Sequence, residues 1–335
     1  MNRTTTEMHE IEAVAEALIP AQEVLITSHL VPDGDSIGAL IGLALGLKQL
    51  GKGVHLCTED EVPRMYRFLE GWERIVRPAA VDPIPDTVVL VDCTGLTRVG
   101  NQLFSLLQGH PNIINLDHHT SNEFFGRINW VDEKAGASAE MVYDLLRKLG
   151  VAIDRPIANA IYTGIITDTG SFRFSSTTSR TMRIAAELMD AGIDQDEIRI
   201  QLFETHTLEM LRLLGESLRT LQVDPNGRLA WISVSQETLC RLKVKDDYGL
   251  FEGLINYPRS IEGVEVAILF REIAPSTIKV GFRSKSWLDV NQLAATYGGG
   301  GHRKAAGCVI EGGMDEVVER VLTQTREVLR NHSGD

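Results

Sequence analysis

The sequence has few cysteines, and none of them are paired at a metal-binding spacing. The four residues Cys57, Cys93, Cys240 and Cys308 are scattered through a chain of 335 residues. Without a CxxC pair, the pattern argues against a structural zinc site. It also argues against the disulfide framework of a small secreted protein.

A long hydrophobic run is also missing. The first ten residues are polar and lack the apolar core of a signal peptide. The longest apolar stretch, 37–50, is shorter than the roughly 20 residues that a transmembrane helix needs, and it includes Lys48 and Gln49. We therefore expect a cytoplasmic protein without a membrane partner.

The chain lacks an excess of positive charge as well. Its formal net charge is −13, whereas proteins that follow long nucleic acids usually carry a basic face. The acidic balance favours a small ligand that is held locally, with metal ions offsetting its charge. The length exceeds that of a usual single domain, so two domains are expected.

Several apolar runs in the first half end in side chains that can bind metal. Strand-like runs at 24–27, 87–92 and 112–117 are separated by helical patterns such as 37–50, 137–149 and 156–167. Apolar strands that alternate with helices predict a parallel sheet covered on both faces. The carboxyl ends of its strands would share one edge, where sites form in open α/β sheets.

The second half has a different pattern. Residues 178–221 are almost wholly helical in character, and short strands are expected at 229–234, 264–270 and 277–282. Helices near 289–296 and 315–330 flank a glycine-rich turn. We therefore predict an α/β protein with a catalytic domain at 1–190, a helical linker at 191–215 and a smaller α/β domain at 216–335.

The polar residues at the predicted strand and helix ends form one set of candidate ligands. They are His29, Asp33, Asp35, Asp92, Asp117, His118, His119 and Asp168. Imidazoles and carboxylates without a thiolate suit two divalent ions, manganese most naturally, with cobalt or magnesium as alternatives. Two ions roughly 3.5–4 Å apart can polarise a phosphoryl group and generate hydroxide from a shared water. Asp92 is the carboxylate that we expect to bridge them.

Each of these segments also has a purely structural interpretation. The Asp33-Gly34-Asp35 segment could be a polar loop with a helix cap, Asp92 a strand-end cap, and Asp168 a turn former. Together they are hard to explain by packing, because several buried carboxylates at one edge repel each other unless cations lie among them. The combined pattern favours a metal centre.

These motifs resemble those of a known family, the DHH phosphoesterases. The resemblance is carried by His-x-x-Pro-Asp-Gly-Asp-x-x-Gly at 29–38, Asp92, the Asp-His-His sequence at 117–119, and Asp168. The segment Gly299–Gly307 resembles the GGGH motif of the DHHA1 domain that often accompanies them. Length and the lack of added domains are similar to the NrnA-like enzymes of this superfamily.

The resemblance implies a role for each residue. His29, Asp33 and Asp92 would hold one metal ion, and Asp35, Asp92, His118 and Asp168 would hold the other. His119 would face the scissile phosphate, with Asp117 orienting a histidine as metal ligands generally require. Arg98 would reach the phosphate.

The second domain is expected to bind substrate. Glycines 299, 300 and 301 would let backbone amides approach an anion, and His302 would add a donor. Arg283 and Ser284 resemble the substrate segment of the family, and an arginine can hold a phosphate with its planar fork. The alternatives are a flexible glycine loop and a solvated strand end.

The resulting prediction is a metal-dependent phosphoesterase that cleaves short oligoribonucleotides in the 3′–5′ direction, pAp, or both. A phosphodiesterase of cyclic or linear dinucleotides is the alternative within the family. A nucleotide-binding regulator without catalysis is the alternative from another class. Family II pyrophosphatases do not fit because their second domain differs. An exposed helical face is compatible with a homodimer.

Overall fold

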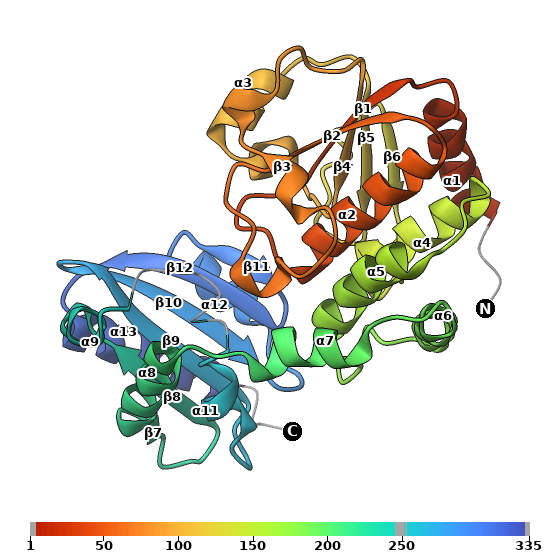
Figure 1. Cartoon of the computed structure of the whole chain (residues 1–335). Coiled ribbons are helices and arrows are strands. Elements are labelled where there is room, and N and C mark those ends of the chain that lie inside the picture. The colour runs from red at the N-terminus through yellow and green to blue at the C-terminus, as the bar shows by residue number, and fades with distance from the viewer. Residues whose placement is uncertain (1–4, 245–250, 252, 332–335) are drawn as a thin grey trace. The chain divides into compact units, whose positions relative to one another are not determined.

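The computed structural model describes residues 5–244, 251 and 253–331 (Figure 1). The chain forms two compact units, Met1–Thr205 and His206–Asp335. Their boundary lies inside the segment 191–215 that the sequence predicts as a linker. Among the described residues, no helix combines the length and apolar character that crossing a bilayer requires.

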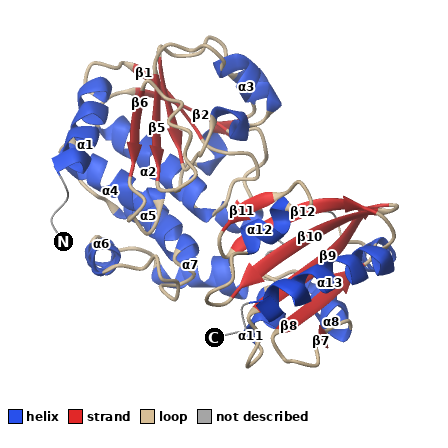
Figure 2. Cartoon of the chain, turned by 180° about the vertical axis from the view of Figure 1, so that it is seen from behind, coloured by secondary structure: helices blue, strands red, loops and turns tan. Residues whose placement is uncertain are grey.

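The first unit is built on a six-stranded sheet in which every neighbouring pair is parallel (Figure 2). Its order is β3-β2-β1-β4-β5-β6. The bounds are β1 Glu23–Thr27, β2 Gly53–Cys57, β3 Ile75–Val76, β4 Thr87–Val91, β5 Ile113–Asp117 and β6 Ile128–Val131. The predicted parallel sheet is confirmed. The two edge strands β3 and β6 were not predicted, because they are only two and four residues long.

Helices cover both faces of this sheet, which explains why its central strands are apolar throughout. Val24 and Ile26 pack in the large core beneath four helices, whereas Leu25 packs on the opposite face with α3. The four helices are α1 Thr5–Leu18, α2 Gly34–Gln49, α4 Ser138–Lys148 and α5 Arg155–Asp168, and α3 is Asn101–Leu107. Alternate side chains of one strand therefore enter two different cores.

Close packing of α2 on α5 positions the predicted site. A Cβ atom on Gly38 would lie 2.4 Å from the carbonyl oxygen of Ala160, and one on Gly164 would lie 2.9 Å from Oδ1 of Asp35. Only glycine permits this approach. It brings the start of α2, which carries Asp35, beside the last turn of α5, which carries Asp168.

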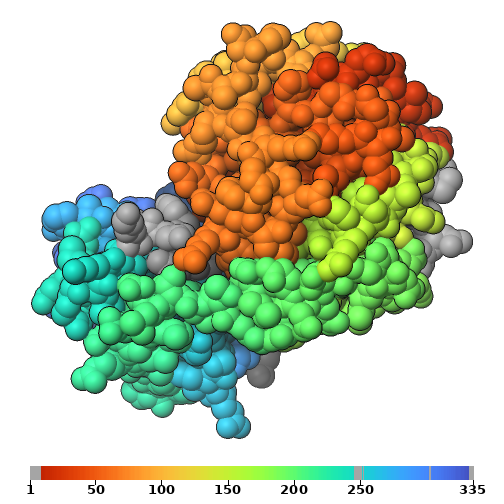
Figure 3. Space-filling view, in the orientation of Figure 1, coloured from red at the N-terminus to blue at the C-terminus, as the bar shows by residue number. Residues whose placement is uncertain are grey.

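The helical stretch predicted over 178–221 is divided into several pieces. These are α6 Ser179–Asp190, α7 Gln195–Arg199, a π-helical turn Ile200–Glu204, and α8 Leu208–Arg219. Side chains of Thr178, Asp194 and Thr207 cap the three α-helices at their starts, and Gly192 adopts a φ of 85° after α6. α6 packs on α5, and the two form a continuous surface in the space-filling view (Figure 3).

The second unit contains a mixed sheet in the order β11-β12-β10-β9-β8-β7, in which only β8 and β9 run parallel. Its strands are β7 Gln222–Val223, β8 Leu229–Val234, β9 Val266–Ala274, β10 Thr277–Ser284, β11 Gly300–His302 and β12 Ala305–Glu311. One face packs on α12 Val290–Ala295 and α13 Met314–Asn331, and the other on α8. Short helices α9 Gln236–Leu242 and α11 Asn256–Ser260 complete the described elements.

Candidate metal centre

The carboxyl ends of β1, β4 and β5 bring their polar side chains together. Nε2 of His29, just after β1, lies 3.4 Å from Oδ2 of Asp92, the residue that follows β4. Nε2 of His118, just after β5, lies 3.7 Å from Oδ1 of the same aspartate. Asp92 is buried and has a φ of 56°, a left-handed conformation that is uncommon for a non-glycine residue and that often marks functional sites.

The turn after β1 adds two carboxylates through the start of α2. Asp33 caps this helix, accepting a hydrogen bond from the backbone N–H of Ser36 at 3.0 Å. Asp35, in the first turn, is buried and accepts hydrogen bonds from the backbone N–H groups of Ser138 and Ala139 at 2.6 and 2.8 Å. The amino terminus of α4 therefore fixes the orientation of the Asp35 carboxyl group.

His29 and His118 have their Nδ1 atoms bonded to backbone carbonyl oxygens. His29 bonds the carbonyl oxygen of Leu30 at 2.8 Å, and His118 bonds that of Ala135 at 3.2 Å. Because a carbonyl oxygen can only accept, Nδ1 carries a proton in both rings, and when the imidazole is neutral its Nε2 lone pair faces the carboxylates. This is the tautomer of a metal-binding histidine whose other nitrogen is held from behind.

The ligand atoms form three overlapping groups, each with atoms within 4.8 Å of one another. The groups are His29, Asp33 and Asp92; Asp35, His118 and Asp168; and Asp92, His118 and His119. Asp92 and His118 each belong to two of these groups. Asp168, at the end of α5, is reached by Nε2 of His118 at 3.5 Å.

The Nε2 atom of His118 provides a direct test of whether these residues suit a metal. It is buried and has no hydrogen-bond partner among the described residues, although carboxylate oxygens of Asp35, Asp92 and Asp168 lie 3.5–3.8 Å away. An unpaired buried nitrogen is costly. A divalent ion bound by this nitrogen and the surrounding oxygens would give the nitrogen a partner, so these residues fit a divalent metal ion.

The pKa values at this site show the same demand for positive charge. Burial raises the pKa of Asp35 well above its usual value, and the charges of Asp92 and Asp168 raise it further. Burial likewise raises the pKa of Asp168, to about 6. Burial lowers the pKa of His118, but the surrounding carboxylates outweigh this effect and raise it to about 9. Cations placed among these carboxylates remove their mutual repulsion.

His119 has a different environment from the other two histidines. Its Nδ1 atom donates to Oδ1 of Asp117 at 2.7 Å, and Oδ2 of Asp117 accepts from Nδ2 of Asn122 at 2.7 Å. Burial raises the pKa of Asp117, but the hydrogen bonds from His119 and Asn122 outweigh burial and keep that pKa below its usual value. Asp117 therefore stays charged and fixes the orientation of His119.

Two residues in this arrangement were missed by the sequence analysis. Asn122 also bonds Oδ1 of Asn115 and the carbonyl oxygen of Cys93, so it joins three segments behind Asp117. Ser138 donates its hydroxyl to Oδ1 of Asp92 at 3.0 Å. Asn122 lies three residues after the His-His pair, so its position close behind the motif was the one available signal.

Arg98 lies beside the same edge of the sheet. It belongs to a short 3-10 turn, Leu96–Val99, and its carbonyl oxygen accepts from the backbone N–H of Leu30 at 2.6 Å. This contact fixes the Arg98 backbone next to the loop that carries His29. Its side chain is exposed.

The predicted substrate residues of the second unit lie at one end of its sheet. Arg283 in β10 pairs with Ala305 in β12, which in turn pairs with the backbone of His302 in β11. The side chain of His302 is outside the described part of the structure. Ser284 is only 1% exposed and faces away from Arg283, because adjacent residues of a strand point to opposite faces.

The glycine segment forms an edge strand instead of an open loop. A Cβ atom on Gly299 would lie 2.2 Å from the carbonyl oxygen of Gly307, and one on Gly301 would lie 2.5 Å from that of Ala305. Close packing against β12 therefore requires glycine at both positions. A Cβ atom on Gly300 would meet nothing nearer than 3.6 Å, so this position remains open to a ligand.

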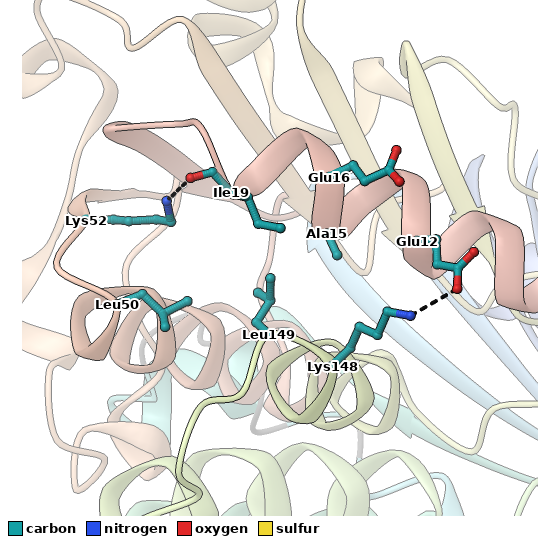
Figure 4. Close-up of a pocket in the computed structure, with 8 residues that line it drawn as sticks. All are labelled: Glu12, Ala15, Glu16, Ile19, Leu50, Lys52, Lys148 and Leu149. Atoms are coloured by element: carbon teal, nitrogen blue, oxygen red, sulfur yellow. Dashed lines mark hydrogen bonds and ion pairs between the residues drawn. The ribbon is translucent and has the colours of Figure 1, made fainter.

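A separate hollow of about 480 Å³ lies far from the metal centre (Figure 4). It is lined by Glu12, Ala15, Glu16, Ile19, Leu50, Lys52, Lys148 and Leu149. Lys52 donates to the carbonyl oxygens of Ile19 and Ala21, and Lys148 pairs with Glu12. The hollow adjoins the carboxyl ends of α2 and α4, and the metal-site residues lie at the amino ends of these helices. The contacts of Lys52 and Lys148 therefore join neighbouring helices and are remote from the metal centre.

Comparison with known proteins identifies matches to both halves of the chain. The profile of the DHH family, N-terminal domain, matches residues 23–165, and that of the DHHA1 domain matches residues 241–331. The bifunctional oligoribonuclease and PAP phosphatase NrnA of Thermus thermophilus is 35% identical over 322 residues, which cover 96% of this chain and 94% of the relative. NrnA of Bacillus subtilis is 27% identical over 312 residues, covering 92% and 95%.

A solved structure agrees with these sequence matches. An exopolyphosphatase-related protein from Bacteroides fragilis is 29% identical to this chain, with a TM-score of 0.89. The match covers 96% of this chain and 98% of that one. The order of a DHH domain followed by a DHHA1 domain is therefore that of the predicted family.

Proposed function

This chain belongs to the DHH family, and we propose that it is a divalent-metal-dependent phosphoesterase whose substrates are short oligoribonucleotides and pAp. The observation that carries the proposal is the buried Nε2 atom of His118, which faces three carboxylates and has no hydrogen-bond partner in the part of the chain that the structure describes. The substrate class rests on the similarity to the NrnA relatives, which spans almost the whole chain.

We assign the metal-holding residues to two positions. His29, Asp33 and Asp92 hold one ion, while Asp35, Asp92, His118 and Asp168 hold the other. Asp92 serves both, in keeping with its presence in two of the ligand groups. The hard oxygen and imidazole donors favour manganese. Divalent ions bound there would polarise the phosphoryl group and lower the pKa of a coordinated water.

The remaining residues of the first unit act on the substrate. His119, whose Nδ1 atom is bonded to Asp117, meets a phosphoryl oxygen or gives a proton to the leaving oxygen. Arg98 supplies positive charge to the phosphate from the loop beside His29. Asp117 and Asn122 keep the imidazole of His119 in place.

The second unit recognises the part of the substrate that is not cleaved. Arg283 offers a planar guanidinium that can hold a phosphate through two hydrogen bonds. Backbone N–H groups around Gly300 add donors without a side chain in the way. Ser284 is not assigned to the substrate, because its side chain is buried and its backbone N–H donates to the carbonyl oxygen of Lys304 at 3.0 Å.

A panel of substrates tests the proposal. Metal-stripped protein with added manganese should release mononucleotides from di- to tetranucleotide RNA and phosphate from pAp, and should cleave long RNA more slowly. Chelator should abolish both activities. Full activity without metal would overturn the metal assignment. Faster hydrolysis of a cyclic dinucleotide than of any linear substrate would overturn the substrate class.

A further inference from the structure

Val31, two residues after His29, has a backbone conformation that is unfavourable for its side chain. Its φ is 57°, in the left-handed region. Such a value is an outlier for a β-branched residue, and the following Pro32 favours an extended backbone at this position. Strained residues of this kind persist where surrounding groups hold them, and they gather at functional sites. The contacts around Val31 therefore bear on how the metal-binding loop is fixed.

The carboxylate of Asp60 holds this conformation from a distant segment. The backbone N–H of Val31 donates to Oδ2 of Asp60 at 2.8 Å, across 29 positions of sequence. Asp60 follows β2 and is itself fixed, because the hydroxyl of the buried Thr58 donates to its carbonyl oxygen at 2.7 Å. The backbone N–H of Thr58 bonds the carbonyl oxygen of Val76 in β3 at 3.2 Å. The carboxylate therefore reaches Val31 from an anchored turn.

A single peptide group connects Asp60 to His29. Its N–H belongs to Val31 and donates to Asp60. Its C=O belongs to Leu30 and accepts from Nδ1 of His29 at 2.8 Å. The opposite ring nitrogen of His29, Nε2, lies 3.4 Å from Oδ2 of Asp92, the proposed bridging carboxylate. Asp60, this peptide group and His29 therefore form a hydrogen-bonded chain that ends at the metal centre.

The chemistry of this chain suits a metal-binding histidine. Such a ring needs an acceptor on its second nitrogen, which sets the tautomer and the orientation of the ring. A carboxylate that accepts from the N–H of a peptide polarises the group and makes its carbonyl oxygen a stronger acceptor. A flip of the peptide between Leu30 and Val31 would instead take this oxygen away from His29. The bond to Asp60 opposes that flip, because the N–H would lose its carboxylate partner.

We propose that Asp60 is a positioning residue that orients the imidazole of His29 through the peptide group between Leu30 and Val31. This inference rests on the proposed function, in which His29 holds one of two ions, and adds to it what fixes that ligand. If Asp60 were only a turn residue after β2, its loss would loosen the first unit without a preference for either ion. The positioning role instead weakens only the ion that His29 holds.

Calorimetric titration of the metal-stripped full chain with manganese tests the proposal. The wild type should bind two ions. Asp60→Ala should weaken the binding of one ion roughly tenfold and leave the other unchanged, as for loss of a group that orients one ligand. Asp60→Asn keeps an acceptor oxygen and should retain most of the affinity. Glu61→Ala, at an exposed neighbouring carboxylate that pairs with Arg67, should match the wild type.

A double-mutant cycle identifies which ion is affected. His29→Ala should lose the ion that Asp60→Ala weakens, and adding Asp60→Ala to His29→Ala should change manganese binding no further, because the two residues act as one unit. Asp168→Ala should lose the other ion, and the effect of Asp60→Ala on the remaining ion should persist in full. If Asp60→Ala does not fold, Asp60→Ser takes its place, because serine is polar but too short to reach the N–H of Val31.

Each failure points to a different error. If the wild type binds fewer than two manganese ions, the proposed two-ion centre is wrong and the inference falls with it. If the wild type binds two ions but Asp60→Ala weakens both alike or neither, only the positioning role is overturned. The same holds if Asp60→Asn binds as weakly as Asp60→Ala, or if Asp60→Ala causes a further loss in the His29→Ala background.

Discussion

Nε2 of His118 lies 3.5 Å from Oδ2 of Asp168, which joins the end of β5 to the end of α5. The distance is longer than a good hydrogen bond and suits two atoms that bind the same ion from different sides. Close packing of α2 on α5 through Gly38 and Gly164 places Asp168 at this distance. The metal centre therefore depends on helix packing as well as on strand ends.

The first prediction separates metal holding from chemistry. Asp92→Ala should lose bound manganese and activity together, because Asp92 belongs to two ligand groups. His119→Ala should keep most of the metal and lose turnover, because its Nδ1 atom is held by Asp117. Metal analysis of the purified variants, alongside kcat, checks this. A metal-free His119→Ala with a fully loaded Asp92→Ala would reverse the two roles.

The second prediction concerns Asn122. Removing its amide in Asn122→Ala should lower kcat roughly tenfold or more while KM and manganese content change little, as for other groups that orient an active-site side chain. Asn122→Asp should be worse than Asn122→Ala, because its carboxylate would face that of Asp117 across the 2.7 Å contact. Equal losses in KM, or loss of metal, would show that Asn122 supports the whole site and not His119 in particular.

The third prediction concerns Arg283. Binding energy from a remote phosphate helps to position the scissile bond, so Arg283→Ala should lower kcat and raise KM for a dinucleotide. Hydrolysis of a small generic phosphodiester should stay nearly unchanged. Arg330→Ala, at the exposed end of α13, serves as the control. A similar loss on both substrates would mean that Arg283 acts through folding.

The fourth prediction concerns pH and the stability of the second unit. The carboxylate of Glu265 accepts hydrogen bonds from the backbone N–H groups of Ser286, Trp287 and Leu288. Burial opposes its ionisation, but these bonds outweigh burial and lower its pKa below the ordinary 4.5. The contribution of the ionised Glu265 carboxylate to folding stability is therefore complete above pH 4.5, and it is lost as the pH falls through the lowered pKa of Glu265.

Comparison of Glu265→Gln with the wild type measures this effect. In urea unfolding the variant should be less stable at pH 7, and the difference should shrink below pH 4.5. The effect of pH on the metal-site residues is the same in both proteins and therefore cancels in the comparison. Glu262→Gln, at an exposed neighbour, should match the wild type throughout. A difference that stays constant down to pH 3 would show that the Glu265 charge is not what holds segment 286–288.

The sequence by itself determined the parallel sheet and the set of candidate ligands. An apolar run that ends in aspartate or histidine indicates a strand that is buried up to its last residue. This is a local property, because it depends only on residues that are adjacent in the sequence. Because parallel strands share one carboxyl edge, His29, Asp92 and His118 were expected to meet, and they do. The short strands β3 and β6 have too few residues to produce such a pattern.

Only the tertiary structure decided which groups support those ligands. Asp35 is held by the N–H of Ser138, 103 residues away, and Asn122 bonds the carbonyl oxygen of Cys93, 29 residues away. The glycines at 299 and 301 are required by the approach of β12. Local preferences act over a few residues, whereas these contacts depend on how distant segments pack.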